Sequence, residues 1–178
     1  KKYEKYLNIK NKDNNKNFTP NKTNEKINTI NKISSLFNFE GYGILVNSEK
    51  FQEGIFKNNE LNGPGRIINK QGEIFCGNFL NSKLNNFGHY INNQGKYEGE
   101  LIDNKRHGTG KEIFKDGSIY EGNYINNKKQ GKGKFVWADG SSYEGEFYND
   151  EINGKGNFRW LDNSYYEGQW KNGKIEGY

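Results

Sequence analysis

The sequence of 178 residues predicts an all-β fold, an elongated single-layer antiparallel sheet of stacked β-hairpins. Three observations favour this fold. Polar and aromatic residues alternate with period two, and one glycine recurs at a nearly constant interval. The apolar fraction is only 31%, whereas 15% of the residues are aromatic and 23 are glycine. This composition suits a thin sheet in which rings lie over glycines better than a thick core.

Residues 1–38 are expected to precede the repeats as a flexible tail with a short helix. Residues 1–29 are rich in Lys and Asn, which is typical of a solvated linker, with a basic arm on an acidic partner as the alternative. Apolar residues then recur at every third position, at Ile27, Ile30, Ile33 and Leu36. We therefore expect an amphipathic helix over Thr23–Phe37, which caps the first hairpin or docks a partner.

The repeat unit is clearest in Tyr120–Gly140. Ser118–Asn126 alternates polar and aromatic residues, and the polar tract Asn126–Gln130 interrupts the alternation. Gly131–Trp137 resumes it, and Asp139-Gly140 supplies a turn. Two alternating segments with turn residues between them are typical of a β-hairpin.

A glycine that follows the Tyr-Glu position marks each unit at intervals of 22 or 23 residues: Gly54, Gly77, Gly99, Gly122, Gly145 and Gly168. The units thus begin near residues 52, 75, 97, 120, 143 and 166, after a half unit at residue 39. A Gly-x-Gly pair follows in most units: Gly63/Gly65, Gly108/Gly110, Gly131/Gly133 and Gly154/Gly156. The second unit keeps only Gly88 and has Asn86 in the other place. We expect two strands per unit in sequential order, about eleven or twelve strands over residues 39–178.

One face of the sheet is expected to be a ladder of stacked rings and glycines, because strand parity separates the faces. The first strands contribute Tyr97, Tyr120, Tyr143 and Tyr166 to it. The second strands contribute Gly131, Gly133, Phe135 and Trp137, and in the next unit Gly154, Gly156, Phe158 and Trp160. Glutamates and a thin row of isoleucines have the opposite parity. Glu112 stands where an aromatic residue is expected, so we predict a local irregularity or bulge there.

The Tyr-Glu-Gly segments Tyr97–Leu101, Tyr143–Phe147 and Tyr166–Trp170, most of them followed by Gly-x-Gly, resemble the MORN repeat (membrane occupation and recognition nexus). The resemblance covers Phe39–Tyr178. It implies a non-enzymatic scaffold. MORN proteins commonly serve as cytoskeletal scaffolds, including parts of ciliary axonemes and of membrane-associated cytoskeleton, and MORN arrays also occur attached to lipid kinases and methyltransferases.

The motifs give no support for catalysis, a cofactor or a metal. No Gly-Lys pair is followed by Ser or Thr, as a phosphate-binding loop requires. His89 and His107 occupy different repeat positions and have no ligand partners at metal-binding spacing. The rings recur at core positions, which disfavours nucleic-acid binding by stacking. Cys76 occupies a position that holds Glu in other units, so it is interpreted as structural.

Charge separates the tail from the repeats. Residues 1–38 carry nine lysines against three acidic residues, whereas the rest carries 18 basic and 19 acidic residues. The resemblance to MORN proteins implies a protein-binding scaffold, which we expect in the cytoplasm, at the cytoskeleton of a cilium, flagellum or cell cortex. The alternatives are a peripheral module that binds acidic phospholipids, with lipid contact through the basic tail, and the regulatory array of a larger enzyme.

The C-terminal edge is expected to be an assembly surface. The last unit holds a full first strand, and Trp170 and Tyr178 are expected to leave apolar area exposed beside it. We expect either that the full-length chain continues the ribbon or that a second molecule completes it, as a homodimer or an end-to-end assembly; a frayed end is the alternative.

Overall fold

The computed structural model describes residues 39–176, and these form one open antiparallel sheet with no helix. The 13 strands are β1 (Gly41–Val46), β2 (Lys50–Lys57), β3 (Glu60–Asn69), β4 (Ile74–Leu80), β5 (Lys83–Asn92), β6 (Gly95–Ile102), β7 (Lys105–Phe114), β8 (Ile119–Ile125), β9 (Lys128–Val136), β10 (Ser142–Tyr148), β11 (Glu151–Arg159), β12 (Tyr165–Lys171) and β13 (Lys174–Glu176). The tail, the expected helix over Thr23–Phe37 and Tyr178 lie outside the described residues.

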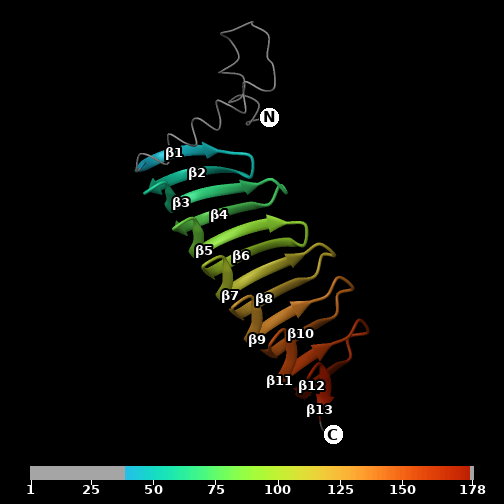
Figure 1. Cartoon of the computed structure of the whole chain (residues 1–178). Helices are drawn as coiled ribbons and strands as arrows, with labels where there is room; N and C mark the ends of the chain where they lie inside the picture. Colours follow the sequence, from blue (N-terminus) through green and yellow to red (C-terminus); the bar gives the residue numbers. More distant parts are fainter. Residues whose placement is uncertain (1–38, 177–178) are drawn as a thin grey trace, which may run out of the picture. The chain divides into compact units, whose positions relative to one another are not determined.

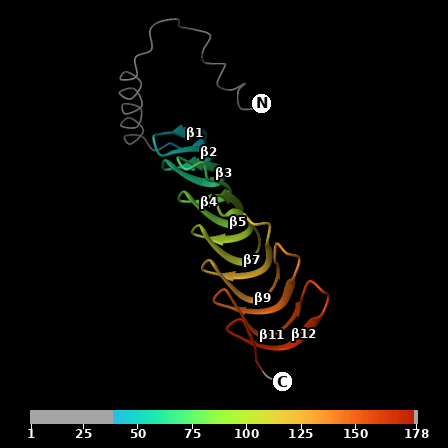
Figure 2. The ribbon, with the colours of Figure 1, turned by 90° about the vertical axis from the view of Figure 1, so that its right-hand side faces the viewer.

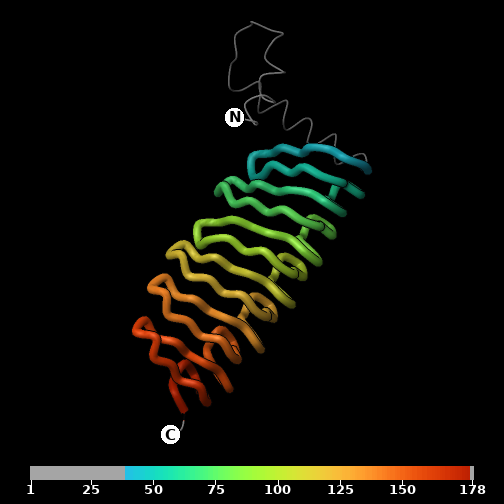
Figure 3. The backbone as a smooth tube through the Cα atoms, turned by 180° about the vertical axis from the view of Figure 1, so that it is seen from behind, coloured from blue at the N-terminus to red at the C-terminus, as the bar shows by residue number. Residues whose placement is uncertain are grey.

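Each strand pairs only with its neighbours in the sequence, so the sheet order is β1 to β13 without a crossover (Figure 1). The predicted all-β single-layer sheet is thereby confirmed, with 13 strands in the described residues rather than eleven or twelve. The hairpins are bent rather than flat (Figure 2), and their turns follow one another regularly along the edges of the ribbon (Figure 3). We call the face that holds the buried rings the inner face and the opposite face the outer face.

A continuous row of twelve glycines crosses the sheet, one in each strand from β1 to β12. Each member pairs with the next across the strands: Gly43, Gly54, Gly65, Gly77, Gly88, Gly99, Gly110, Gly122, Gly133, Gly145, Gly156 and Gly168. Each hairpin contributes two glycines to the row. The 22- or 23-residue interval in the sequence is therefore the length of one hairpin, for example from Gly99 to Gly122.

A tyrosine lies over this row in each of the last four units, which explains why the two residue types recur together. The Tyr97 hydroxyl donates to the Glu100 carbonyl oxygen at 2.7 Å, and Tyr120 and Tyr143 bond the carbonyl three residues later in the same way. A Cβ on Gly133 would lie 2.5 Å from the Tyr120 hydroxyl. The ring thus occupies the volume that any other side chain would need.

A bulge after the row glycine occurs in five of the hairpins, and it explains the first glycine of each Gly-x-Gly pair. The register shifts after Gly99, for example, so that Leu101 pairs with Arg106. Gly108 opposite this shift has φ +60° and Gly131 has +71°. Asn86 has φ +63° at the same position, and asparagine is one of the few other residues that tolerate this conformation.

Two-residue turns join the strands of each repeat along one edge. Their first residues have φ between 49° and 52° and their second residues between 61° and 74°, which is the type I′ geometry favoured in β-hairpins. Each turn also bonds the preceding repeat. The Asn104 backbone N–H donates to the Leu84 carbonyl, and the Asn104 side-chain oxygen accepts from the Leu84 N–H at 2.6 Å. These bonds hold successive hairpins in register.

Replacing Asn104 should separate the two roles of the turn. Asn104→Gly keeps the positive φ but loses the side-chain bond to Leu84, so we expect a loss of about 1 kcal/mol in the free energy of unfolding. Asn104→Val also forces a β-branched residue into the left-handed region, so its loss should be roughly 2–3 kcal/mol. Urea unfolding followed by tryptophan fluorescence measures both. Equal stability of the two variants would show that the φ requirement is unimportant.

The irregularity predicted at Glu112 is wrong. Glu112 pairs in regular register with Tyr97 on one side and Tyr120 on the other. The shifts occur instead after the row glycine, where the chain needs extra residues to bend. The structure accommodates Glu112 by a buried ion pair, described below, rather than by changing the backbone.

Candidate interaction surfaces

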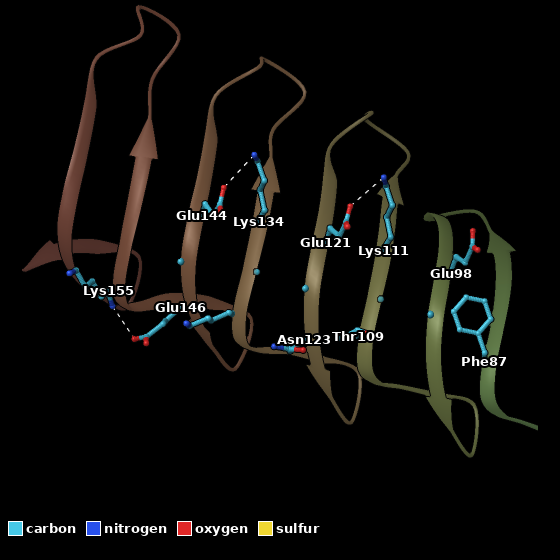
Figure 4. A pocket seen from close by; sticks show the side chains of 16 residues that line it. Phe87, Glu98, Thr109, Lys111, Glu121, Asn123, Lys134, Glu144, Glu146 and Lys155 are labelled. Carbon is cyan, nitrogen blue, oxygen red and sulfur yellow. Dashed lines mark hydrogen bonds and ion pairs between the residues drawn. The ribbon is translucent and has the colours of Figure 1, made fainter.

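The outer face carries an open trough of about 1040 Å³ that runs across strands β5 to β11 (Figure 4). Its floor is the backbone of the glycine row, on the side of the sheet opposite to the tyrosine rings. Charged residues form the walls: Glu98, Glu121, Glu144 and Glu146, with Lys111, Lys132, Lys134 and Lys155. Four carboxylates and four ammonium groups balance, so the trough presents alternating charge with no net charge.

Within this trough the charges are arranged as cross-strand pairs. Lys111 Nζ lies 3.4 Å from Glu121 Oε2, and Lys134 Nζ lies 3.4 Å from Glu144 Oε2 (Figure 4). All four side chains are at least half exposed, so each pair contributes little to stability. Their charges remain accessible to a partner.

Two glutamates that directly follow a row glycine, Glu100 and Glu146, have a structural role. Glu100 Oε1 accepts hydrogen bonds from the Thr109 backbone N–H at 2.9 Å and from its hydroxyl at 2.7 Å. The bond from the backbone N–H, and to a smaller extent the bond from the hydroxyl, hold the pKa of the Glu100 carboxyl below its ordinary value. Glu146 accepts from the Lys155 N–H at 3.0 Å in the equivalent place. Both therefore satisfy backbone groups at the bulges and are not arranged as an acid and a base.

The inner face contains a buried polar cluster at its centre. Arg106 forms an ion pair with Glu112, and the Tyr124 hydroxyl donates to Glu112 Oε2 at 2.9 Å. The exposed fractions of the Arg106 and Glu112 side chains are only 20% and 11%. Burial, and secondly the Glu112 carboxylate, raise the pKa of the Tyr124 hydroxyl. Every member of this cluster needs the others, because an unpaired charge here would remain poorly solvated.

Lys129 occupies the same repeat position in the next unit and is surrounded by rings. Its Nζ lies 5.2 to 5.6 Å from the ring centres of Phe114, Tyr120 and Phe135. Cation–π contacts of this kind stabilise an ammonium group that is partly removed from water. Burial nevertheless lowers the pKa of Lys129. On the inner face, the charges of Arg106 and Lys129 therefore contact side chains of the same face, namely Glu112 and the three rings.

The rings singled out in the sequence form a connected ladder on the inner face. Phe135 lies 4.7 Å from Trp137 between ring centres, Trp137 lies 5.2 Å from Phe158, and Phe158 lies 4.8 Å from Trp160. Tyr97, Tyr120 and Tyr143 are fully buried, but these second-strand rings are half-buried or, for Trp160, 38% exposed. The first strand therefore contributes most of the core.

The expectation that Trp170 is exposed at the C-terminal edge is wrong. Its side chain is 6% exposed, and it packs against Tyr143, Phe158 and Tyr166. Trp170 closes the core of the last unit, and its indole N–H donates to the Gly156 carbonyl oxygen at 3.3 Å. Apolar exposure at this end comes instead from Tyr165 and Ile175.

One column of inner-face residues was missed in the sequence. It lies seven residues after the row glycine and consists of Leu61, Leu84, Arg106, Lys129, Ile152 and Ile175. Leu61 and Leu84 are completely buried over the glycines of the first two full units, where Gln52 and Phe75 replace tyrosine. The recurrence of Leu or Ile at this repeat position could have revealed the column. Lys129 hid it, because this residue lies in the polar tract Asn126–Gln130.

Two kinds of site are absent from residues 39–176. No three His, Cys, Asp or Glu side chains come together in a way that could hold a metal ion. None of the described segments is a helix of sufficient length and apolarity to cross a membrane.

A family model described as the MORN repeat matches residues 53–72, 97–119, 120–142, 143–165 and 166–178, which is more than half of the chain. The chain belongs to the MORN repeat family. The MORN segments coincide with hairpins of the sheet, and the unmatched unit around Gly77 is the one with Phe75-Cys76 in place of Tyr-Glu and with Asn86 in place of glycine. No curated protein matches the chain.

MORN repeats are non-enzymatic modules that commonly mediate contact with proteins or membranes. The geometry of this MORN array agrees with such a role. Its repeated hairpin unit builds a long two-sided surface, and its polar groups at the bulges and turns bond the backbone.

Proposed function

We propose that the chain is a non-enzymatic scaffold that assembles other proteins along its ribbon. The observation that supports this most strongly is the outer face, which runs over many strands and alternates charge without a net excess of either sign. Such a surface suits recognition of another protein, where complementary charges set register and specificity. It is poorly suited to nucleic acid, whose binding depends on concentrated positive charge.

We further propose a cytoplasmic location at the cytoskeleton, either in a cilium or flagellum or at the cell cortex. This rests on the resemblance to MORN scaffolds. The test is purification of the full chain from its native cells after chemical cross-linking, followed by identification of cross-linked peptides. The proposal expects cytoskeletal proteins joined to residues of the array. A chain that purifies alone, or joined only to lipid, would overturn it.

The ends of the ribbon offer a route to a homodimer or to end-to-end assembly. Among the described residues, β13 pairs only with Gln169–Lys171 of β12, so the outer edge of Tyr165–Gly168 has no strand beside it. Edges of this kind pair readily with another strand, from a second copy or from a different protein.

A second candidate is contact with acidic lipid through the basic tail, favoured by the net charge of residues 1–38. We predict that replacing the nine lysines of this tail by glutamine in the full chain abolishes sedimentation with phosphatidylserine vesicles, because the near-neutral array attracts little. The wild-type chain should lose binding as salt rises. Vesicle binding that survives the nine replacements would contradict the assignment to the tail.

The remaining proposal is that the chain is the regulatory array of a larger enzyme. A catalytic domain encoded in the same gene, such as a lipid kinase or a methyltransferase, would support it.

A further inference from the structure

The outer face carries a continuous row of apolar side chains beside the charged trough. One residue from each of β1 to β9 pairs with the next across the strands: Val46, Phe51, Ile68, Ile74, Ile91, Lys96, Ile113, Ile119 and Val136. We call this the isoleucine row. Eight of its nine members are apolar, and each is exposed or half-buried. No described residue covers it, since the sheet is a single layer.

A ladder of alternating charge runs parallel to the isoleucine row. Two residues along each strand from the row, β6 to β10 carry Glu98, Lys111, Glu121, Lys134 and Glu144 in direct cross-strand register. The row and the ladder together form a stripe that is apolar on one side and charged on the other. An exposed apolar strip with a charged rim is typical of a protein interaction site.

The spacing of this stripe matches an α-helix laid across the strands. Adjacent strands are about 4.8 Å apart, so equivalent residues of successive hairpins lie about 9.6 Å apart. A helix advances about 10.5 Å per heptad and presents apolar side chains every three or four residues, at intervals of about 5 Å. The nine strands of the row span roughly 38 Å, the length of a helix of about 25 residues.

We propose that the outer face binds a long amphipathic α-helix of a partner protein, with its apolar stripe on the isoleucine row. The inference rests on the proposed scaffold function and names the kind of partner. The charge ladder selects the partner by its flanking residues. Because like charges recur every second strand, a helix with one basic and one acidic flanking position in each heptad meets Glu98, Glu121 and Glu144 with its basic groups and the two lysines with its acidic ones.

The test uses the full chain and a labelled synthetic peptide of about 25 residues. The peptide is an alanine-based helix with leucine at the two stripe positions of each heptad, and with lysine and glutamate at the two positions that flank the stripe on one side. It is kept below the concentration at which it self-associates. Fluorescence anisotropy should show saturable binding, and a peptide of the same composition with scrambled leucines should not bind.

Protein variants locate the binding surface. Ile91→Glu with Ile113→Glu should weaken binding by at least about tenfold, by placing two carboxylates under the apolar stripe. The matched control is Ile102→Glu with Ile125→Glu, because these side chains are somewhat more exposed than Ile91 and Ile113 but lie near the turns. The control should bind as the wild type does. Circular dichroism checks that both proteins remain folded.

Three results would overturn the proposal: no binding of the helical peptide to the wild-type chain, equal loss in both double variants, or no loss in either. The cross-linking experiment described above keeps this failure distinct from that of the scaffold function. If Ile91→Glu with Ile113→Glu still recovers the wild-type partners, the array is a scaffold that does not use this stripe. If the wild-type chain itself recovers none, the scaffold function fails first.

Discussion

Gly122→Val is expected to destabilise the sheet by about 3 kcal/mol or more and to lower the melting temperature by roughly 10 °C. A Cβ at this position would lie 2.5 Å from the Gly133 Cα and 2.8 Å from the Lys132 carbonyl oxygen, both backbone atoms of the neighbouring strand. It would also lie 2.6 Å from the Tyr120 hydroxyl. Neither the strand nor the buried ring can move without disturbing the adjacent hairpins.

The matched control is Glu121→Val, one residue away on the same strand. Glu121 faces solvent and forms only an exposed ion pair with Lys111, so its loss should change the free energy of unfolding by less than about 1 kcal/mol. Differential scanning calorimetry compares both variants with the wild type. If Gly122→Val and Glu121→Val have the same melting temperature, the rings do not require glycine in this row.

Glu112→Ala is expected to cost roughly 3 kcal/mol, because it leaves the Arg106 guanidinium poorly solvated and without its ion pair. The Tyr124 hydroxyl also loses its acceptor. Chemical denaturation measures the effect. A loss below about 1 kcal/mol would show that water replaces the carboxylate and that the cluster is not effectively buried.

A double variant that restores the residue types of other units should recover this stability. Leu84 occupies the position of Arg106 in the second unit, and Phe135 occupies the position of Glu112 in the fourth. Arg106→Leu with Glu112→Phe should therefore be as stable as the wild type or more so, since packed apolar residues often equal a buried ion pair. A double variant that is less stable than Glu112→Ala would show that the apolar pair does not fit this unit.

The fold could be predicted from the sequence because its two determinants are visible there. Period-two alternation indicates strands, and the interval between glycines indicates the hairpin length. Sequential pairing then leaves one arrangement, in which Gly99, Gly110 and Gly122 fall in one row. The type I′ geometry at Asn126-Asn127 could not be predicted, because the polar tract after β8 gave no indication of where the turn ended and β9 began.

The candidate surfaces were less predictable. The compensation between Arg106 and Glu112 requires knowing that a bulge brings positions six residues apart together on the inner face. Lys129 was assigned to the polar tract Asn126–Gln130, so the alternation that starts at Gly131 was not counted back to it. Trp170 was expected to be exposed because the chain ends soon after it, but the ring folds back over Tyr143 and Tyr166. Cross-strand contacts of this kind depend on register, which sequence alone specifies only in part.

The array is one open layer whose strands follow one another in sequence, and distances between spin labels test this arrangement most directly. With Cys76 replaced by serine, pairs of labelled cysteines on the outer face at residues 98 and 144, 98 and 167, and 53 and 167 span four, six and ten strand intervals. An open ribbon predicts distances that increase with the number of intervals, of about 19, 29 and 48 Å, less a few ångströms for curvature. A distance between residues 53 and 167 no longer than that between residues 98 and 144 would mean that the ends of the array meet, and would contradict the open ribbon.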